Sequence, residues 1–143
     1  VLLLDLPIEE AADTRRALDR RGLDQIFLLS PTTTDRRLAE AASLGRGFLY
    51  AISRLGVTGA RQTVADTAEP LVRRIRAASS LPVALGFGIS RPEHVAEVTT
   101  FADAAVVGSA LVQTVARTAD NGEEPGEAAE RFVRWLKGSE HGG

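Results

Sequence analysis

The 143-residue sequence has no cysteine, one lysine and two histidines, and these shortages exclude several kinds of chemistry. Without cysteine there is no disulfide and no thiolate nucleophile, a composition that suits a cytoplasmic protein. Lys137 lies near the C-terminal end, which is a poor place for Schiff-base catalysis. His94 and His141 are too few to build a metal site from imidazoles, so we expect no metal. Acid–base chemistry would depend on carboxylates, on Tyr50 or on groups from outside the chain.

Neither the net charge nor the apolar runs indicate a nucleic-acid or membrane partner. The 17 basic and 19 acidic residues give a formal net charge of −2, so bulk electrostatics do not favour nucleic acid. No apolar run approaches the roughly 18 residues that a membrane-spanning helix needs. The first residues lack the basic segment of a signal peptide, and none is expected. At 44% hydrophobic residues, the chain can form one domain with a buried core.

Five short apolar runs alternate with segments of helical pattern. Each run is nearly continuous in apolar residues, which is typical of strands covered on both faces in a parallel sheet. The runs are Val1–Asp5, Gln25–Ser30, Gly47–Ile52, Leu81–Gly86 and Ala104–Gly108. Helices are expected from Pro7 to Arg21, Asp35–Leu44, Thr67–Ala78, Ser90–Val98, Ser109–Thr118 and Ala129–Leu136. Alternating units of this kind predict an α/β fold, as a doubly wound sheet or as part of a (β/α)₈ barrel.

Two local signals concern the ends of helices. Ser90 and Glu93 have the spacing of a capping box, which predicts a helix that starts directly after Ser90. Asp5 is the only carboxylate at the C-terminal end of an apolar run. It could cap the helix that begins near Pro7, or it could organise polar groups at the end of the sheet where barrel enzymes do their chemistry.

Glycine-rich turns come late in the chain. A doubly wound nucleotide-binding fold places such a turn after its first strand, but here the first run continues as DLPIEE, without glycine. Instead, Gly86–Gly88 follows the fourth run and Gly108 precedes Ser109 after the fifth. Phosphate sites of (β/α)₈ barrels lie after the last two strands, and glycine at a helix N-terminus lets backbone N–H groups approach an anion. The pattern favours a barrel with a phosphate site, although each loop alone is better explained as a tight turn and only the two together make the phosphate site an equal alternative.

Several segments resemble the tryptophan synthase alpha chain in the same order and spacing, from Leu4 to about Leu136. They are DLPIEE, IFLLSPTT, GRGFLYAISRLGVTG, LGFGIS and VVGSALV. That family is a (β/α)₈ barrel that cleaves indole-3-glycerol phosphate to indole and glyceraldehyde 3-phosphate by a retro-aldol reaction. The resemblance implies that the five runs are barrel strands 4 to 8. Residues 1–143 would then be the C-terminal portion of a single barrel domain, with Val1 as the start of a fragment.

The resemblance also implies a set of site residues. Around the substrate phosphate it places Gly59, Gly88, Gly108 and Ser109, and around the indole it places Leu2, Leu4, Tyr50, Phe87 and Val106. The family's catalytic glutamate and aspartate correspond to positions upstream of Val1, so this chain alone is expected to be inactive. Asp5 and Thr58, the latter in a loop that closes over substrate, would have supporting roles. The implied partner is the beta chain, which carries pyridoxal phosphate; no cofactor is expected in this chain.

Two other interpretations of the residues stay open. Another phosphate-binding barrel enzyme, such as an indole-glycerol-phosphate synthase or a sugar-phosphate epimerase, would use lysines or metal-binding histidines at strand ends, and these residues are scarce here. A non-catalytic module would be a five-stranded doubly wound domain, or a half-barrel that only docks a partner. The strand order distinguishes a barrel from a doubly wound domain, because a sequential order indicates a barrel whereas a switch point indicates a doubly wound sheet.

Overall fold

Four short strands form one parallel sheet in the computed structural model, which describes residues 1–52, 64–86 and 88–138. The strands are β1 (Phe27–Leu29), β2 (Leu49–Ile52), β3 (Val83–Gly86) and β4 (Ala104–Val106). Their order in the sheet is their order in the chain, and each neighbouring pair is parallel. The sequential order excludes a doubly wound sheet and agrees with the predicted partial barrel.

The first apolar run, Val1–Asp5, is not a strand of this sheet, so the prediction of a fifth strand is wrong. A single parallel bridge joins Leu2 to Ile26, and the backbone N–H of Ile26 donates to the Val1 carbonyl over 2.8 Å. Leu4 is 70% exposed. Val1, Leu2 and Leu3 are also exposed, so the run lacks the cover on both faces that is typical of a parallel strand.

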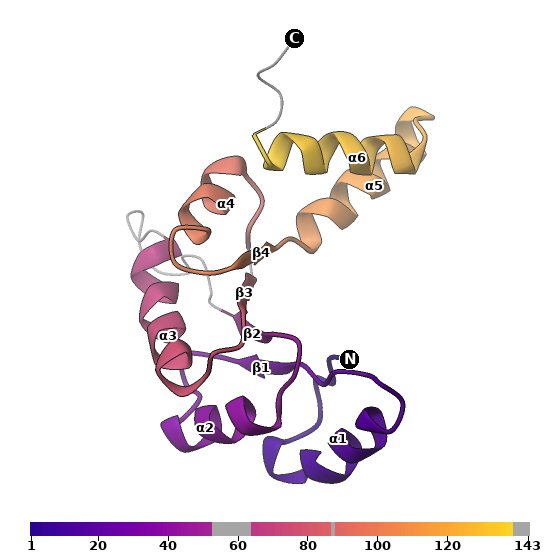
Figure 1. The fold of residues 1–143 in the computed structure, drawn as a ribbon. Helices are drawn as coiled ribbons and strands as arrows, with labels where there is room; N and C mark the ends of the chain where they lie inside the picture. Colours follow the sequence, from indigo (N-terminus) through magenta and orange to yellow (C-terminus); the bar gives the residue numbers. More distant parts are fainter. Residues whose placement is uncertain (53–63, 87, 139–143) are drawn as a thin grey trace.

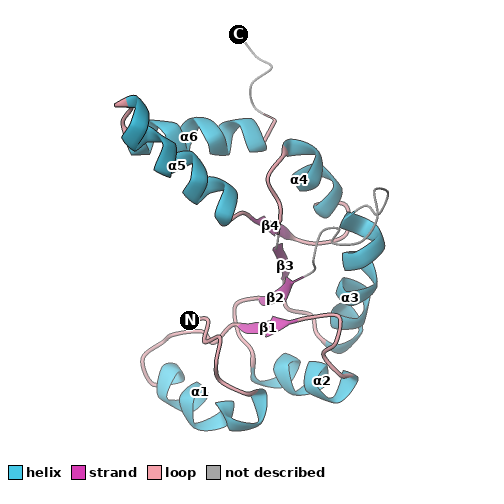
Figure 2. Ribbon diagram, turned by 180° about the vertical axis from the view of Figure 1, so that it is seen from behind, coloured by secondary structure: helices cyan, strands magenta, loops and turns pink. Residues whose placement is uncertain are grey.

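Helices lie along the outer side of the curved sheet and beyond its end (Figure 1, Figure 2). They are η1 (Ile8–Glu10), α1 (Ala11–Asp19), α2 (Asp35–Leu44), α3 (Val64–Ala78), α4 (Pro92–Val98), α5 (Ser109–Asn121) and α6 (Pro125–Leu136). Figure 1 shows α2, α3 and α4 along the outer side of the sheet, while the inner side is open. Figure 2, from behind, shows α5 and α6 as a pair that projects from the end of β4. A helical layer outside the sheet, with no helix of the described residues on its inner side (Figure 1), is the layout of a barrel wall. No helix in the described part of the chain is long and apolar enough to cross a membrane.

Helix α4 starts at Pro92, one residue after the start that the capping box predicts, and the predicted capping box is wrong. Arg91 is its N-cap residue, with an extended backbone (φ −138°, ψ 155°), and no side chain caps the helix. Pro92 accounts for this start. A proline is favoured at the first helical position, and its ring forces the preceding residue out of the helical region.

The core lies between the sheet and the outer helices. Leu29, Leu49 and Leu85 from the strands pack with Ile75 of α3, and all four side chains are fully buried. Burying each of them contributes about 1.5–3 kcal/mol relative to exposure. All four residues of β3 are buried, whereas no residue of β4 is.

An ionic clamp, formed by the Asp103 carboxylate with the Val83 N–H and the Arg76 guanidinium, holds the N-terminal end of β3. The carboxylate of Asp103, in the loop before β4, accepts the backbone N–H of Val83 over 2.7 Å and an Arg76 guanidinium N–H over 2.9 Å. The hydrogen bond from Val83 and the nearby Arg76 charge hold the pKa of the Asp103 carboxyl below its usual range. Because this end of a barrel is remote from the chemistry, we interpret the clamp as a stabilising feature.

Candidate functional site

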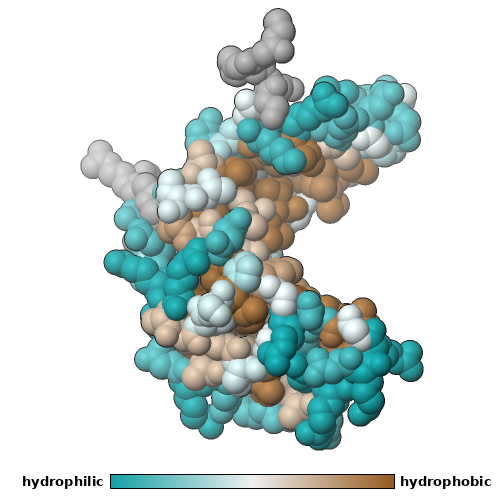
Figure 3. Space-filling model, in the orientation of Figure 1, coloured by the Kyte–Doolittle hydropathy of each residue, from teal (hydrophilic) through white to brown (hydrophobic). Residues whose placement is uncertain are grey.

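A pocket of about 420 Å³ lies at the C-terminal ends of β2, β3 and β4. Its described lining residues are Tyr50, Gly88, Ile89, Ser90, Val106, Gly108, Ser109, Ala110 and Gln113. In Figure 3 the molecule is hollowed on its inner side, and apolar residues gather on the wall that leads to α5. This is the end of a parallel barrel where active sites are built.

Tyr50 reaches the pocket from β2 because the neighbouring strand leaves room for its ring. Gly86 of β3 lies directly beside the phenol, and a Cβ atom at Gly86 would stand 2.6 Å from Cε2 of Tyr50. Gly86 is therefore a strand residue that permits close packing, and not part of the turn that the sequence predicted. Burial raises the pKa of the Tyr50 hydroxyl above its ordinary value, which is already well above neutral pH, and the protonated group can donate a hydrogen bond.

The segment from Gly88 to Ser90 forms the wall of the pocket beside β3. Gly88 has φ +79°, a left-handed conformation that favours glycine. Ile89 is 3% exposed and packs in the core, which anchors the segment. The Ser90 backbone N–H donates to Nδ1 of His94 over 3.4 Å. The turn glycine of the LGFGIS segment is therefore Gly88.

The N-terminus of α5 forms the opposite wall. Gly108 is the N-cap residue (φ −113°, ψ −83°) and has no side-chain cap, and its carbonyl accepts the N–H of Val112 over 3.1 Å. The first N–H groups of a helix have no partner within it, and the macrodipole makes this end positive. Ser109 and Ala110, the first two helical residues, both line the pocket. An anion in the pocket would meet free N–H groups and the Ser109 hydroxyl.

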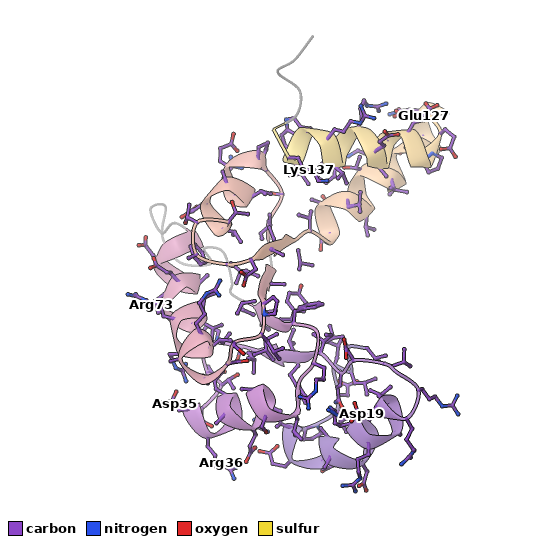
Figure 4. All side chains as sticks on the ribbon, viewed as in Figure 1. Asp19, Asp35, Arg36, Arg73, Glu127 and Lys137 are labelled. Carbon is purple, nitrogen blue, oxygen red and sulfur yellow. The ribbon has the colours of Figure 1, made fainter. Side chains whose placement is uncertain are left out.

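The described lining of the pocket carries no ionisable group other than the Tyr50 phenol. In Figure 4, the labelled charged residues Asp35, Arg36 and Arg73 lie on the outer helices α2 and α3, away from the open side of the sheet. No group of three or more potential metal-ligating side chains occurs within residues 1–52, 64–86 and 88–138. The pocket can therefore hold an anion by hydrogen bonds and a helix dipole, and an apolar group against Tyr50 and Val106.

Five of the eleven residues predicted for the site line this pocket. They are Tyr50, Gly88, Val106, Gly108 and Ser109. Leu2 and Leu4 lie on the exposed N-terminal segment and are not among its lining residues. Thr58, Gly59 and Phe87 lie outside the described residues, and their roles stay predictions.

The structure also adds residues that the sequence did not indicate. Ile89, Ser90, Ala110 and Gln113 line the pocket. Gln113 lies four residues after Ser109, a spacing that puts both on one helix face, so the helical period could have found it. Asp5 is exposed, and neither η1 nor α1 has a side-chain cap, so the capping alternative is wrong, while its supporting role in the site stays a prediction.

Parallel strands in sequential order, with one outer layer of helices and a pocket at the carboxyl ends, define part of a (β/α)₈ barrel. A model of the tryptophan synthase alpha chain family matches residues 1–140. The chain belongs to the tryptophan synthase alpha chain family.

Individual relatives agree with this assignment. A tryptophan synthase alpha chain from Geotalea uraniireducens is 50% identical over 137 residues, which are 96% of this chain and 51% of that protein. One from Methanosarcina barkeri is 44% identical over 138 residues, which are 96% of this chain and 50% of that protein. A solved structure of the tryptophan synthase α₂β₂ complex from Pyrococcus furiosus matches with a TM-score of 0.77 at 32% identity, over 96% of this chain and 52% of that chain. The chain spans about half the length of the curated relatives it matches.

Proposed function

We propose that this chain supplies the phosphate-binding side of a tryptophan synthase alpha active site, in which indole-3-glycerol phosphate is cleaved to indole and glyceraldehyde 3-phosphate. The observation that carries the proposal is the pocket between Gly88 and the N-terminus of α5. A phosphate dianion needs several hydrogen-bond donors, and this pocket offers them without a lysine or arginine among its described residues. The family membership supports the proposal that this anion is the substrate's phosphate.

In this proposal the residues of the chain bind and orient the substrate. The N–H groups at the start of α5 and the Ser109 hydroxyl hold the phosphate, and Tyr50 and Val106 contact the indole. Binding at the phosphate is remote from the bond that breaks, so its free energy serves to place the glycerol chain for reaction.

The proton transfers would come from groups outside this chain. The described lining of the pocket contains no carboxylate that could act as general acid or base. In the family these groups are a glutamate and an aspartate that correspond to positions before Val1. The proposal further includes a tryptophan synthase beta chain as partner, with pyridoxal phosphate bound there and not here, and a cytoplasmic location.

The test of the phosphate site is a titration of inorganic phosphate by NMR or calorimetry. Gly88→Val should weaken binding by about tenfold or more, because loss of one hydrogen bond to a charged group costs about 1.5–3 kcal/mol. Gly22→Val is the matched control: Gly22 also has a left-handed backbone (φ +66°) but follows α1 and does not line the pocket. Equal affinities in the wild type and both variants would show that LGFGIS is only a turn.

The test of the reaction is a measurement of indole release. The 143-residue chain alone should release none from indole-3-glycerol phosphate, and adding a chain that carries the first half of an alpha-chain barrel should restore measurable turnover. Substantial turnover by the 143-residue chain alone would contradict the proposal that the groups for proton transfer come from outside this chain.

A further inference from the structure

His94 is the third residue of α4, and its side chain turns back toward the pocket wall. The helix begins at Pro92, and the His94 backbone N–H donates to the Arg91 carbonyl over 3.1 Å. From this position the imidazole Nδ1 accepts the backbone N–H of Ser90 over 3.4 Å. A glutamate or glutamine at the third helical position satisfies a backbone N–H before the helix in the same manner in a capping box.

The other imidazole nitrogen has a competing neighbour. Nε2 of His94 lies 3.1 Å from Nη2 of Arg91. A neutral imidazole accepts a hydrogen bond at one nitrogen and donates at the other, whereas an arginine can only donate. The imidazole can therefore accept from Ser90 or from Arg91, but not from both.

The different exposures of Arg91 and Ser90 favour the contact between the imidazole and the Ser90 N–H. Arg91 is exposed and can bond to water instead, while Ser90 is half-buried and its backbone N–H is fixed by the chain. A backbone N–H that loses its partner away from water is costly. This favours the tautomer with the proton on Nε2 and the lone pair on Nδ1.

We propose that His94 is a positioning residue for the pocket, which as the Nε2–H tautomer holds the Ser90 backbone and thereby the wall that starts at Gly88. Ser90 and Gly88 both line the pocket, and Ile89 between them is fixed in the core. His94 itself is not among the lining residues, so it acts through Ser90. The consequence for phosphate rests on the function proposed above, whereas the contact with Ser90 does not.

The first experiment is amide hydrogen exchange by NMR on the 143-residue chain, without ligand. Exchange at Ser90 should accelerate roughly two- to tenfold in His94→Ala, which loses one hydrogen bond. In His94→Gln, whose amide oxygen can accept the hydrogen bond, the exchange rate at Ser90 should equal that of the wild type. In Arg91→Ala it should also equal that of the wild type. Exchange at Leu29, in the buried strand β1, serves as the reference for global stability. Equal Ser90 rates in the wild type and His94→Ala would overturn the proposal, as would acceleration in Arg91→Ala to match His94→Ala.

The second experiment measures phosphate affinity in the same four proteins. His94→Ala should bind phosphate more weakly, with His94→Gln and Arg91→Ala close to the wild type. If the wild type binds no phosphate, the proposed function fails while the exchange data still decide the role of His94. If His94→Ala does not fold, the ¹⁵N spectrum of the wild-type imidazole decides, because a proton on Nδ1 instead of Nε2 contradicts the proposal.

Discussion

Strands β3 and β4 are hydrogen-bonded neighbours, yet one is the most buried strand of the sheet and the other the most exposed. Ala84, Leu85 and Gly86 of β3 pair with Ala104, Ala105 and Val106 of β4. β3 lies between two strands and packs against α3, whereas β4 pairs with one strand, β3, within the described part of the chain. Both are short apolar runs, so the difference comes mainly from their neighbours.

The two strands support opposite walls of the pocket. β3 anchors the wall of the barrel, and its carboxyl end leads into the turn at Gly88. β4 leads into α5, and the pocket lies between the turn at Gly88 and the N-terminus of α5. Burial of β3 therefore fixes one wall of the candidate site, while the other wall is attached to a strand with few contacts.

The largest expected difference between the two strands is in the cost of removing a side chain. Leu85→Ala should lower the free energy of unfolding by about 2–5 kcal/mol, because the side chain is 1% exposed and its loss leaves a cavity. Val106→Ala, at a half-buried position of β4, should cost about 1 kcal/mol or less. Urea denaturation of both variants measures this, and equal costs would remove the distinction between the strands.

A second test adds volume to β3 instead of removing it. Gly86→Ala places a methyl group against the Tyr50 ring and should cost about 1–3 kcal/mol through overpacking. In a Tyr50→Ala background the same change should cost at least about 1 kcal/mol less, because the ring is gone. The four unfolding free energies of this double-mutant cycle give the coupling. A coupling of zero would show that Gly86 is glycine for another reason.

The glycines that follow the two strands should also differ. Gly88→Ala should cost about 1–2 kcal/mol because its φ is +79°. Gly108 has φ −113°, and a methyl group there would meet no atom within 4 Å beyond its own chain neighbours. Gly108→Ala should therefore cost only the few tenths to about 1 kcal/mol of a poorer N-cap. Thermal unfolding of the two variants measures both values. A cost for Gly108→Ala equal to that for Gly88→Ala would mean that Gly108 is required by the fold and not only by the site.

Much of this arrangement could be predicted from the sequence, and the failures have physical causes. Near-continuous apolar runs predicted the four strands because a strand covered on both faces leaves that pattern. The same pattern failed at Val1–Asp5, since composition does not reveal whether a neighbouring strand is present. Tyr50 and Ser109 were placed in the site by resemblance. Ser90 and the role of His94 could not be predicted, because they depend on where Pro92 starts the helix.

The smallest expected effect concerns the contact that ties the two strands together at their other end. Asp103 precedes β4 but accepts the N–H of Val83, the first residue of β3, and pairs with Arg76. Asp103→Asn keeps an acceptor for Val83 and loses the charge. Because the side chains of Asp103 and Arg76 are each 45% exposed, water screens the pair, and the variant should lose only about 0.5–1 kcal/mol at neutral pH.

The pH dependence has a definite sign. The folded pKa of Asp103 is below its unfolded value, so its contribution is present above the unfolded pKa and is lost as the pH falls through the folded one. The gap between wild type and Asp103→Asn should therefore be constant from about pH 7 to 5 and shrink below about pH 4. Asp13→Asn, at an exposed pair with Arg16 within α1, is the matched control and should change stability by less than about 0.5 kcal/mol. A gap that persists unchanged at pH 2 would mean that the Asp103 carboxylate does not stabilise the junction of β3 and β4 through its charge.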